Sequence, residues 1–369
     1  MSHSRLDAAY MALALRLAAR GRGRTHPNPM VGAVVVSKGR IVGQGYHRRA
    51  GGPHAELYAL RAAGRRARGG TLYVTLEPCS HTDKRTPPCA PAIVASKVRR
   101  VVVAMRDPNP RVSGRGITAL RRSGLTVTVG CRREEAEQLN EAYCHWMRTG
   151  RPYVVLKGAM TLDGKIAAAD GESQWITGEA ARRHAHRLRS EMDAVMVGVG
   201  TVLRDDPRLT VRLVKRSTVR QPWRVIVDST LRLPMTARVL SGGRAIVATT
   251  AKAPPARIER LRAQGVIVLV LPLQDGRVSL RACLERLGRM GVGRVLIEGG
   301  SELNAAALRN GLVNRVLLYV APRLLGGQDA KSLIGGASPK RLAAAIPLRH
   351  IHLRRVGSDL LIEGRPSHH

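Results

Sequence analysis

The sequence predicts an α/β protein of two domains, and three observations predict it. The chain has 369 residues, which is long for a single hydrophobic core. Short apolar runs alternate with amphipathic helical segments, a pattern typical of a sheet with helices on both faces. A turn at Thr149–Pro152 interrupts this alternation. We therefore expect one domain in residues 1–148 and a second, different domain in residues 149–369.

The first half is expected to begin with an amphipathic helix that Ser4 caps. A turn at Thr25–Pro29 follows, because proline restricts both itself and the residue before it. A β-hairpin comes next, and strands then alternate with helices. The predicted helices cover residues 4–20, 54–68, 116–123 and 132–148, with a further helix that opens near Cys89. The predicted strands cover residues 31–37, 41–46, 71–76, 100–105 and 126–129.

The second half restarts with a strand and repeats the alternation without repeating the sequence. Its predicted helices cover residues 179–191, 279–290 and 301–310. Its predicted strands cover residues 153–160, 194–199, 224–228, 245–249, 266–271, 294–298, 315–321, 348–354 and 359–363.

Composition limits the class of protein. The apolar fraction is 44% although phenylalanine is absent, so aliphatic side chains must fill the cores. No apolar run approaches the roughly 20 residues that span a membrane. We expect no signal peptide, because the first residues lack an uninterrupted apolar core and a cleavage site. Five cysteines favour a reducing cytoplasm over a disulfide framework.

The net charge of +36 is spread along the chain. Residues 1–150 contain 26 Lys/Arg against 9 Asp/Glu, and residues 151–369 contain 36 against 17. Nucleic-acid binders usually gather basic residues on one face, often with stacking aromatics, and aromatics are only 3% of this sequence. We therefore expect a solvated, arginine-rich surface that attracts small phosphorylated substrates, and no nucleic-acid or membrane partner.

A metal site is predicted between residues 54 and 89. His54 and Glu56 lie at a helix start, Cys79 follows a strand, and Cys89 opens another helix. One imidazole and two thiolates are three ligands of a tetrahedral zinc, and the open fourth position indicates catalysis. His-x-Glu followed by Pro-Cys and a second Cys marks zinc deaminases, in which the glutamate is the acid/base and not a ligand.

Glu56 would accept a proton from water that zinc activates, deliver it to a ring nitrogen, and then protonate the departing amine. Two alternatives stay open at this point. The two cysteines can be small buried apolar residues. A closed structural zinc site needs a fourth ligand, which His81 can supply.

In the second half, a predicted strand runs through Glu298 into Gly299-Gly300-Ser301 and a helix. The first amides of that helix can bind a phosphate, although the pattern is not the GxGxxG of a dinucleotide fold. The alternative is a plain connection between the strand and the helix. A second glycine-rich turn, Leu325–Gly327, is interpreted as a loop.

The sequence resembles the bifunctional deaminase–reductases of riboflavin biosynthesis over nearly the whole chain. The matching stretches are His26–Gly32, His54–Glu56, Leu76–Cys89, Asp107–Pro110, Thr161–Lys165, Gly171–Thr177 and Asp205–Thr210. The resemblance implies a cytidine-deaminase-like three-layer α/β/α domain, followed by a dihydrofolate-reductase-like α/β domain. One departure is the loop Ser80–Pro88, whose nine residues are one more than we expect. The extra residue falls at Thr82–Lys84, which leaves the loop's substrate contacts in doubt but not the ligands.

The resemblance also implies the chemistry. One zinc per chain supports hydrolytic deamination of 2,5-diamino-6-(5-phosphoribosylamino)pyrimidin-4-one, and NADPH then reduces the ribosyl group to ribityl. The residues by themselves do not decide between NADPH and NADH. A homodimer or larger assembly through the reductase half is implied as well.

The family's contacts are carried over by motif. The implied NADPH contacts are Ala159, Trp175, Thr201, Asp205, Ser229, Gly300, Ser301, Glu302, Leu303, Asn304, Ala305 and Ala306. The implied substrate contacts are Asn28, Lys165, Ser173, Arg189, Leu209, Arg212 and Glu298, with Arg189 and Arg212 suited to the phosphate. Plainer roles stay open: a turn residue for Asn28, core packing for Trp175, and a solvated surface for the two arginines.

Two other functions compete with this interpretation. A nucleic-acid editing deaminase would grip RNA and flip a base into the zinc pocket, and it would release ammonia from structured RNA. A non-enzymatic binding protein with a structural zinc would lose nothing when Glu56 is replaced.

Overall fold

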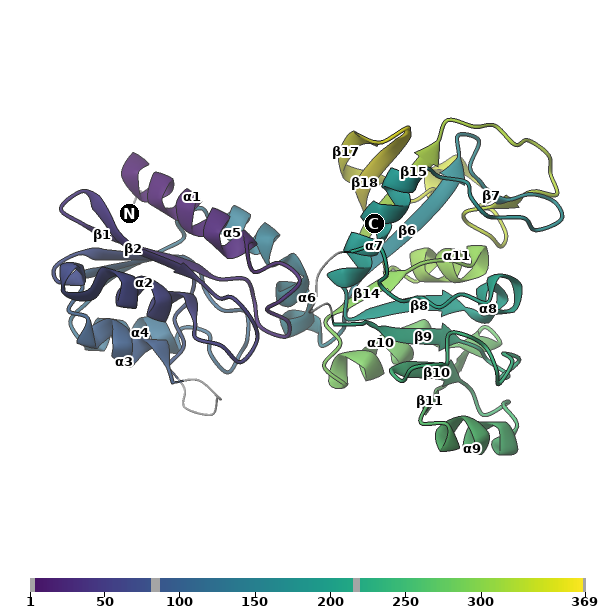
Figure 1. Cartoon of the computed structure of the whole chain (residues 1–369), viewed down its shortest axis with the longest axis horizontal. Coiled ribbons are helices and arrows are strands. Elements are labelled where there is room, and N and C mark those ends of the chain that lie inside the picture. The colour runs from purple at the N-terminus through teal and green to yellow at the C-terminus, as the bar shows by residue number, and fades with distance from the viewer. Residues whose placement is uncertain (1–3, 81–86, 215–219, 368–369) are drawn as a thin grey trace. The chain divides into compact units, whose positions relative to one another are not determined.

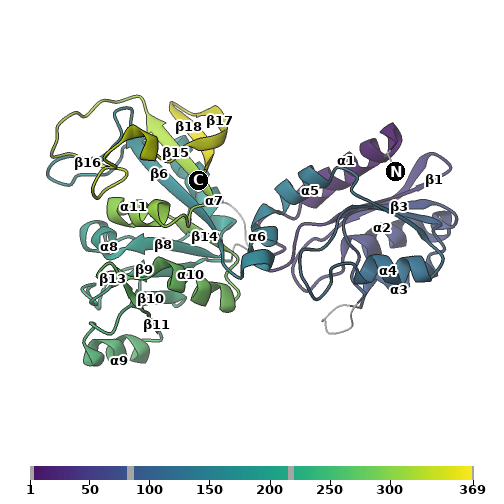
Figure 2. The ribbon, with the colours of Figure 1, turned by 180° about the vertical axis from the view of Figure 1, so that it is seen from behind.

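The computed structural model describes residues 4–80, 87–214 and 220–367. The chain divides between Gly150 and Arg151 into two compact units. Figures 1 and 2 show the ribbon from opposite sides, with the first unit in purple and blue. Among the described residues, no helix has both the length and the apolar character needed to cross a membrane.

The first unit is built on a five-stranded sheet in the order β2-β1-β3-β4-β5. Its strands are β1 (Gly32–Ser37), β2 (Arg40–Tyr46), β3 (Thr71–Leu76), β4 (Arg100–Met105) and β5 (Thr126–Val129). β1 is antiparallel to both β2 and β3, whereas β3, β4 and β5 are parallel. The parallel strands end at one edge of the sheet, and the predicted metal loop follows the end of β3 at this edge.

Helices cover both faces of this sheet, as the alternation of strands and helices predicts (Figure 1). They are α1 (Arg5–Ala19), α2 (Ala55–Ala63), α3 (Cys89–Ala95), α4 (Arg115–Arg122), α5 (Arg133–Leu139) and α6 (Glu141–Thr149). One core cluster joins α2, α3 and α4 to the sheet, and a second cluster joins α1 and α5 to its opposite face. The predicted three-layer α/β/α fold is confirmed.

Two predicted helices differ from those observed. The helix expected over 54–68 ends at Ala63 and continues as a short 3-10 turn, because Gly64 has a φ of +54°. The helix expected over 132–148 is divided at Asn140 into α5 and α6. The fully buried Asn140 side chain exchanges hydrogen bonds of 2.8 and 2.9 Å with the backbone of Met30. Because this contact joins residues that are far apart in the sequence, the local sequence around Asn140 does not predict the break in the helix.

The second unit is built on a nine-stranded sheet in the order β11-β10-β9-β8-β14-β6-β15-β18-β17. Neighbours from β11 to β15 are parallel, and β18 and β17 close one edge as antiparallel strands. These strands are β6 (Tyr153–Thr161), β8 (Ala194–Gly198), β9 (Trp223–Val227), β10 (Ala245–Thr249), β11 (Ile267–Val270), β14 (Arg294–Ile297), β15 (Arg315–Ala321), β17 (Leu348–Val356) and β18 (Asp359–Pro366). Two small two-stranded sheets pair β7 (Lys165–Ala167) with β16 (Lys331–Ser332), and β12 (Leu273–Gln274) with β13 (Arg277–Val278).

Helices also cover both faces of the second sheet. They are α7 (Glu179–Ser190), α8 (Val199–Asp205), α9 (Pro255–Ala263), α10 (Leu280–Arg289) and α11 (Ser301–Arg309). Leu156 of β6 belongs to the aliphatic cluster beneath α10 and α11. On the other face, His184 of α7 contacts Tyr319 of β15. The sequence analysis missed α8, which follows β8 without a turn, and α9, whose many arginines obscure its apolar stripe.

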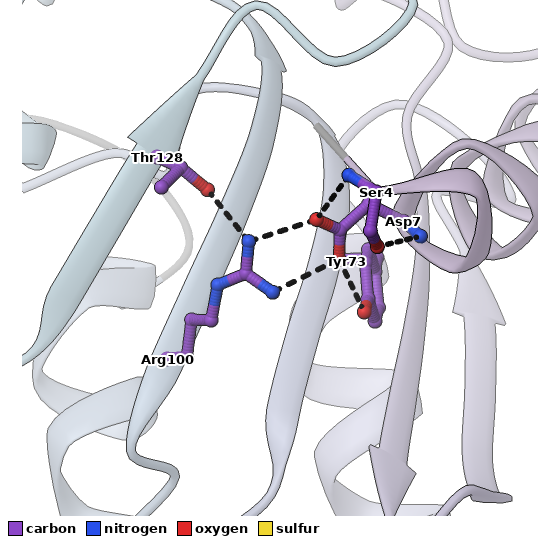
Figure 3. Close-up of polar contacts among 5 residues, drawn as sticks. All are labelled: Ser4, Asp7, Tyr73, Arg100 and Thr128. Atoms are coloured by element: carbon purple, nitrogen blue, oxygen red, sulfur yellow. Dashed lines mark hydrogen bonds and ion pairs between the residues drawn. The ribbon is translucent and has the colours of Figure 1, made fainter. Parts of the chain in front are cut away.

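A buried carboxylate fastens α1 to the sheet of the first unit (Figure 3). Asp7 accepts two hydrogen bonds of 2.9 Å from Arg100 of β4 and one of 2.8 Å from the Tyr73 hydroxyl of β3. Asp7 also completes a capping box with Ser4. Burial by itself would raise the pKa of Asp7, but the hydrogen bonds from Arg100 and Tyr73 outweigh it and lower that pKa.

We predict that Asp7→Asn lowers the free energy of unfolding of the first unit by about 2 kcal/mol at pH 7, because Arg100 loses its charged acceptor. A lowered pKa in the folded state stabilises the fold above the unfolded pKa of about 4, and this contribution disappears as the pH falls. The difference between wild type and variant should therefore shrink below about pH 4. Hydrogen exchange of the α1 amides measures this difference in stability. A difference that does not depend on pH would contradict the role given to the Asp7 carboxylate.

Candidate functional site

The predicted metal ligands meet at one edge of the first sheet. His54 immediately precedes α2, Cys79 lies three residues beyond the end of β3, and Cys89 is the first residue of α3. The Cys79 carbonyl accepts hydrogen bonds of 3.0 and 3.1 Å from the amides of Cys89 and Ala90. These bonds fasten the two cysteine segments together, so two helix starts and one strand end surround a single point.

The three ligand atoms are close enough to hold one metal ion. His54 Nδ1 lies 3.1 Å from Cys89 Sγ and 3.5 Å from Cys79 Sγ, and all three atoms lie within 4.8 Å of one another. Ligand atoms around a tetrahedral zinc are expected at separations of about 3.5 Å. Both cysteines are buried and His54 is half-buried. The donor set therefore fits zinc.

Glu56 lies beside these ligands, in the first turn of α2. It is 3% exposed, and its Oε2 atom is buried without a hydrogen-bond partner among the described residues. Burial raises the pKa of Glu56, although the neighbouring His54 opposes the effect. A buried carboxylate with one unused oxygen is suited to accept and return a proton.

The two thiols differ in their electrostatics, and that of Cys79 suits metal binding. The hydrogen bond that Cys89 donates to Cys79, together with burial, raises the pKa of Cys89. A hydrogen bond from Cys89 and the nearby His54 hold the pKa of Cys79 well below its ordinary value. Thiolate is the form of cysteine that binds metal. His81 and the extra residue at Thr82–Lys84 lie outside the described residues.

Asn28 is brought to the same place by a residue that the sequence analysis missed. Its Nδ2 atom lies 3.1 Å from Nε2 of the buried His47, whose Nδ1 atom lies 3.0 Å from the Pro53 carbonyl. A carbonyl only accepts hydrogen bonds, so Nδ1 of His47 carries the hydrogen and Nε2 accepts from Asn28. The His47 and His54 rings are edge to face at 5.4 Å. Only the pairing of β1 with β2 reveals this contact.

The second unit contains a cavity of about 990 Å³, at the upper end of the range of ligand pockets. Most of the predicted reductase contacts line it: Ala159, Ser173, Trp175, Arg189, Thr201, Asp205, Arg212, Ser229, Glu298, Gly300, Ser301, Glu302, Leu303, Asn304 and Ala306. Three others do not line it. The Lys165 ammonium donates to the carbonyls of Gly327 and Ala330, while Leu209 and Ala305 are buried.

A buried ion pair lies in this cavity. Glu298 follows β14 and accepts hydrogen bonds of 2.8 and 2.6 Å from Arg189 of α7, and these side chains are only 4% and 14% exposed. Arg189 also donates to the Thr210 carbonyl, 3.1 Å away. Burial by itself raises the pKa of Glu298, but Arg189 and Lys157 outweigh it and the pKa is lowered. Glu298 is thus held as an anion.

Two further cavity residues were missed by the sequence analysis. Lys157 of β6 lies 5.7 Å from the Tyr319 ring, and burial lowers its pKa more than Glu298 raises it. A lysine inside an otherwise apolar strand is a signal that could have identified it. Burial, with help from Arg189, lowers the pKa of His186 to about 4. Its Nδ1 atom accepts from the Arg212 amide at 3.1 Å, so His186 is neutral with its hydrogen on Nε2.

The glycine-rich turn after β14 forms another wall of the cavity. Gly299 and Gly300 have φ values of +129° and +89°, which favour glycine. A Cβ atom on Gly299 would lie 3.2 Å from Thr201 Oγ1. Gly300 and Ser301, at the start of α11, line the cavity, and a helix start of this kind favours a phosphate.

The segment after β9 contributes a hydroxyl pair and an arginine to the cavity wall. Asp228 is fully buried, and its Oδ2 atom accepts a hydrogen bond of 2.8 Å from the Leu233 amide, whereas the next residues, Ser229 and Thr230, line the cavity. Arg232 also lines the cavity, with its side chain 64% exposed and its Nε atom 4.0 Å from Asp228.

Comparison with known proteins agrees with both halves of the structure. The family model for the cytidine and deoxycytidylate deaminase zinc-binding region matches residues 4–105, and the model for the RibD C-terminal domain matches residues 152–362. The chain is 44% identical over 357 residues to the riboflavin biosynthesis protein RibD of Aquifex aeolicus, covering 97% of this chain and 98% of that protein. It is also 44% identical over 367 residues to RibD of Escherichia coli, covering 96% and 98%.

Solved structures show the same similarity. The structure of Acinetobacter baumannii RibD, form 2, is similar with a TM-score of 0.89 and 40% identity, covering 98% of this chain and 99% of that one. A Thermotoga maritima diaminohydroxyphosphoribosylaminopyrimidine deaminase/5-amino-6-(5-phosphoribosylamino)uracil reductase is similar with a TM-score of 0.82 and 36% identity, covering 98% and 99%.

Proposed function

The chain belongs to the RibD family of riboflavin-biosynthesis proteins, and we propose how its own residues carry out the family's two reactions. It is a bifunctional enzyme, with a zinc-binding deaminase domain and a reductase domain. We assign the deaminase to residues 1–148 and the reductase to residues 149–369. The proposed substrate is 2,5-diamino-6-(5-phosphoribosylamino)pyrimidin-4-one, in agreement with the activities that the name of the Thermotoga maritima relative gives.

For the deaminase, His54, Cys79 and Cys89 would hold one zinc ion, which would supply the Lewis acidity that makes water a nucleophile near neutral pH. Glu56 would take one proton of the attacking water at Oε2 and pass it to a ring nitrogen of the substrate. It would then take the second proton, from the hydroxyl group added to the ring, and pass it to the departing amine. Water and substrate give the carbonyl product and ammonia. The observation that carries this proposal is the buried Glu56 carboxylate, with one unused oxygen, beside a Cys₂His cluster.

The substrate ring is positioned by Asn28. Because His47 accepts a hydrogen bond from the Asn28 amide, the remaining amide hydrogen and the oxygen stay available for the edge of the pyrimidine or its ribose. Asn28 thereby combines the turn role expected from sequence with a binding role.

For the reductase, NADPH would supply a hydride to C1 of the opened ribose. Arg189 and Arg212 would bind the substrate phosphate, with Glu298 holding Arg189 in position. Lys157 and His186 also line the cavity and would contribute an amine and a neutral N–H donor. The amides of Gly300 and Ser301 are proposed to bind the cofactor diphosphate.

The segment after β9 favours NADPH over NADH. In many NAD enzymes a carboxylate after a strand binds the ribose hydroxyls, whereas an arginine there accommodates a 2′-phosphate. Asp228 is buried and already accepts from the Leu233 amide, so Arg232 and Thr230 are the groups available to the adenosine ribose. Arg277 also lines the cavity, but it is paired more closely, with Glu302 at 3.0 Å, than Arg232 is with Asp228 at 4.0 Å.

Two broader properties are also proposed. All five cysteines are free and buried, which favours the reducing cytoplasm. The nucleic-acid editing alternative is not favoured, because the second half matches a reductase rather than an accessory binding domain.

We predict that Glu56→Gln retains zinc and loses at least about 1,000-fold in ammonia release, because the amide cannot carry the proton. Metal analysis and an ammonia assay measure the two quantities. The same variant, given the deaminated product, should reduce it at the wild-type rate. Undiminished deamination would refute the role of Glu56.

We predict that Arg232→Ala raises the KM for NADPH by about 10-fold or more and leaves the KM for NADH unchanged. The reason is that only NADPH has a 2′-phosphate with which the Arg232 guanidinium can pair. Steady-state assays with the deaminated product and each cofactor measure this. Arg260→Ala, an exposed arginine of α9, is the control of equal charge change. Equal effects on the two cofactors would refute the assignment of Arg232.

We predict a homodimer or larger assembly that pairs through β17. This edge strand exposes Ile351 and Leu353, 60% and 63% accessible, on one of its faces. Leu353→Asp should halve the mass measured by light scattering. A monomeric wild type, or an unchanged mass in the variant, would contradict the prediction.

A further inference from the structure

Glu77 lies between β3 and the metal ligand Cys79, and the mechanism does not use it. The side chain is 3% exposed. Its two carboxylate oxygens accept four backbone N–H groups, from Asp107 at 3.3 Å, Gly114 at 2.9 Å, Gly116 at 3.0 Å and Ile117 at 3.3 Å. The hydrogen-bonding capacity of this buried carboxylate is thus used by backbone N–H groups, three of them at the start of α4.

Gly116 allows the metal loop to approach α4 closely. A Cβ atom added to Gly116 would lie 1.8 Å from the carbonyl oxygen of Pro78, the residue directly before Cys79. No side chain fits in this space. The loop is therefore held from two sides, by the Glu77 carboxylate and by contact of the Pro78 backbone with the glycine.

The Asp107–Pro110 turn joins the same contact. The amide of Asp107 donates to Glu77, while its Oδ1 atom accepts from the Asn109 amide and from the Tyr143 hydroxyl of α6, both at 2.9 Å. The sequence singles out this turn, yet it supplies no ligand and no proposed substrate contact. Its connection to Glu77 gives it a function as support for the metal loop.

We propose that Glu77 is a positioning residue for Cys79, holding the thiolate at the distance from His54 that zinc requires. The inference rests on the zinc site proposed above. Downstream, the Cys79 carbonyl is fastened to the start of α3, and upstream only a short segment separates Cys79 from Glu77. A shift of Glu77 thus moves the Cys79 segment relative to His54.

The test uses Glu77→Gln in the full chain. Glutamine keeps the size of the side chain but turns an NH₂ group toward two backbone N–H groups that need an acceptor. We expect zinc affinity to fall by about 10- to 100-fold, the usual effect of removing a group that orients a metal ligand. Competition with a chromophoric chelator measures it. The sulfur-to-metal absorption of the Co²⁺-loaded protein should also weaken or shift.

Asp7→Asn is the matched control, because it destabilises the same unit through α1, whose core cluster is separate from the cluster that contains Cys79 and Cys89. Its zinc affinity and Co²⁺ spectrum should match wild type. Gly116→Ala perturbs the loop without touching the carboxylate and should reproduce the loss; it also carries the test if Glu77→Gln does not fold. Wild-type affinity and spectrum in a folded Glu77 or Gly116 variant would overturn the inference. Failure of wild type to bind zinc would instead overturn the proposed deaminase.

Discussion

The first unit depends on the convergence of three backbone segments around His54, Cys79 and Cys89. Two of these segments are helix starts and one is a strand end, so the ligands occupy the ends of rigid elements. The packing of α2 and α3 against one face of the sheet brings those ends together. Because the aliphatic cores set where the elements end, they also set the spacing of the ligands and the burial of Glu56 beside them.

In the second unit, too, the residues of the site lie at the ends of strands and helices. The segments that follow β8, β9 and β14 all face one cavity, because parallel strands end at the same edge of a sheet. The buried pair of Arg189 and Glu298 joins α7 to the end of β14 across that cavity. A charge pair this deeply buried carries a desolvation cost, which its two hydrogen bonds help to offset.

Interactions that lack a sequence pattern account for what the sequence analysis missed. Asn140 divides a helix through its bonds to Met30, and His47 reaches Asn28 only after β1 and β2 pair. Lys165 and Lys157 show that membership of a sequence motif does not decide which lysine lines the cavity. Lys165 belongs to a recognisable motif but holds a neighbouring loop, whereas Lys157 belongs to no motif and lines the cavity. Motifs identify residues, and only packing decides which way their side chains point.

The sequence by itself determined the two-domain α/β organisation, the identity of the Cys₂His cluster and the choice of Glu56. These features are encoded in hydrophobic period and in short spacings within one loop or one helix turn. Only the tertiary structure decided that Glu77, Gly116 and Asp107 contact one another beside the metal loop, and that Arg232 lines the cavity while Asp228 is buried. Those relationships join residues that are distant in sequence or differ only in side-chain direction, and no local pattern records either property.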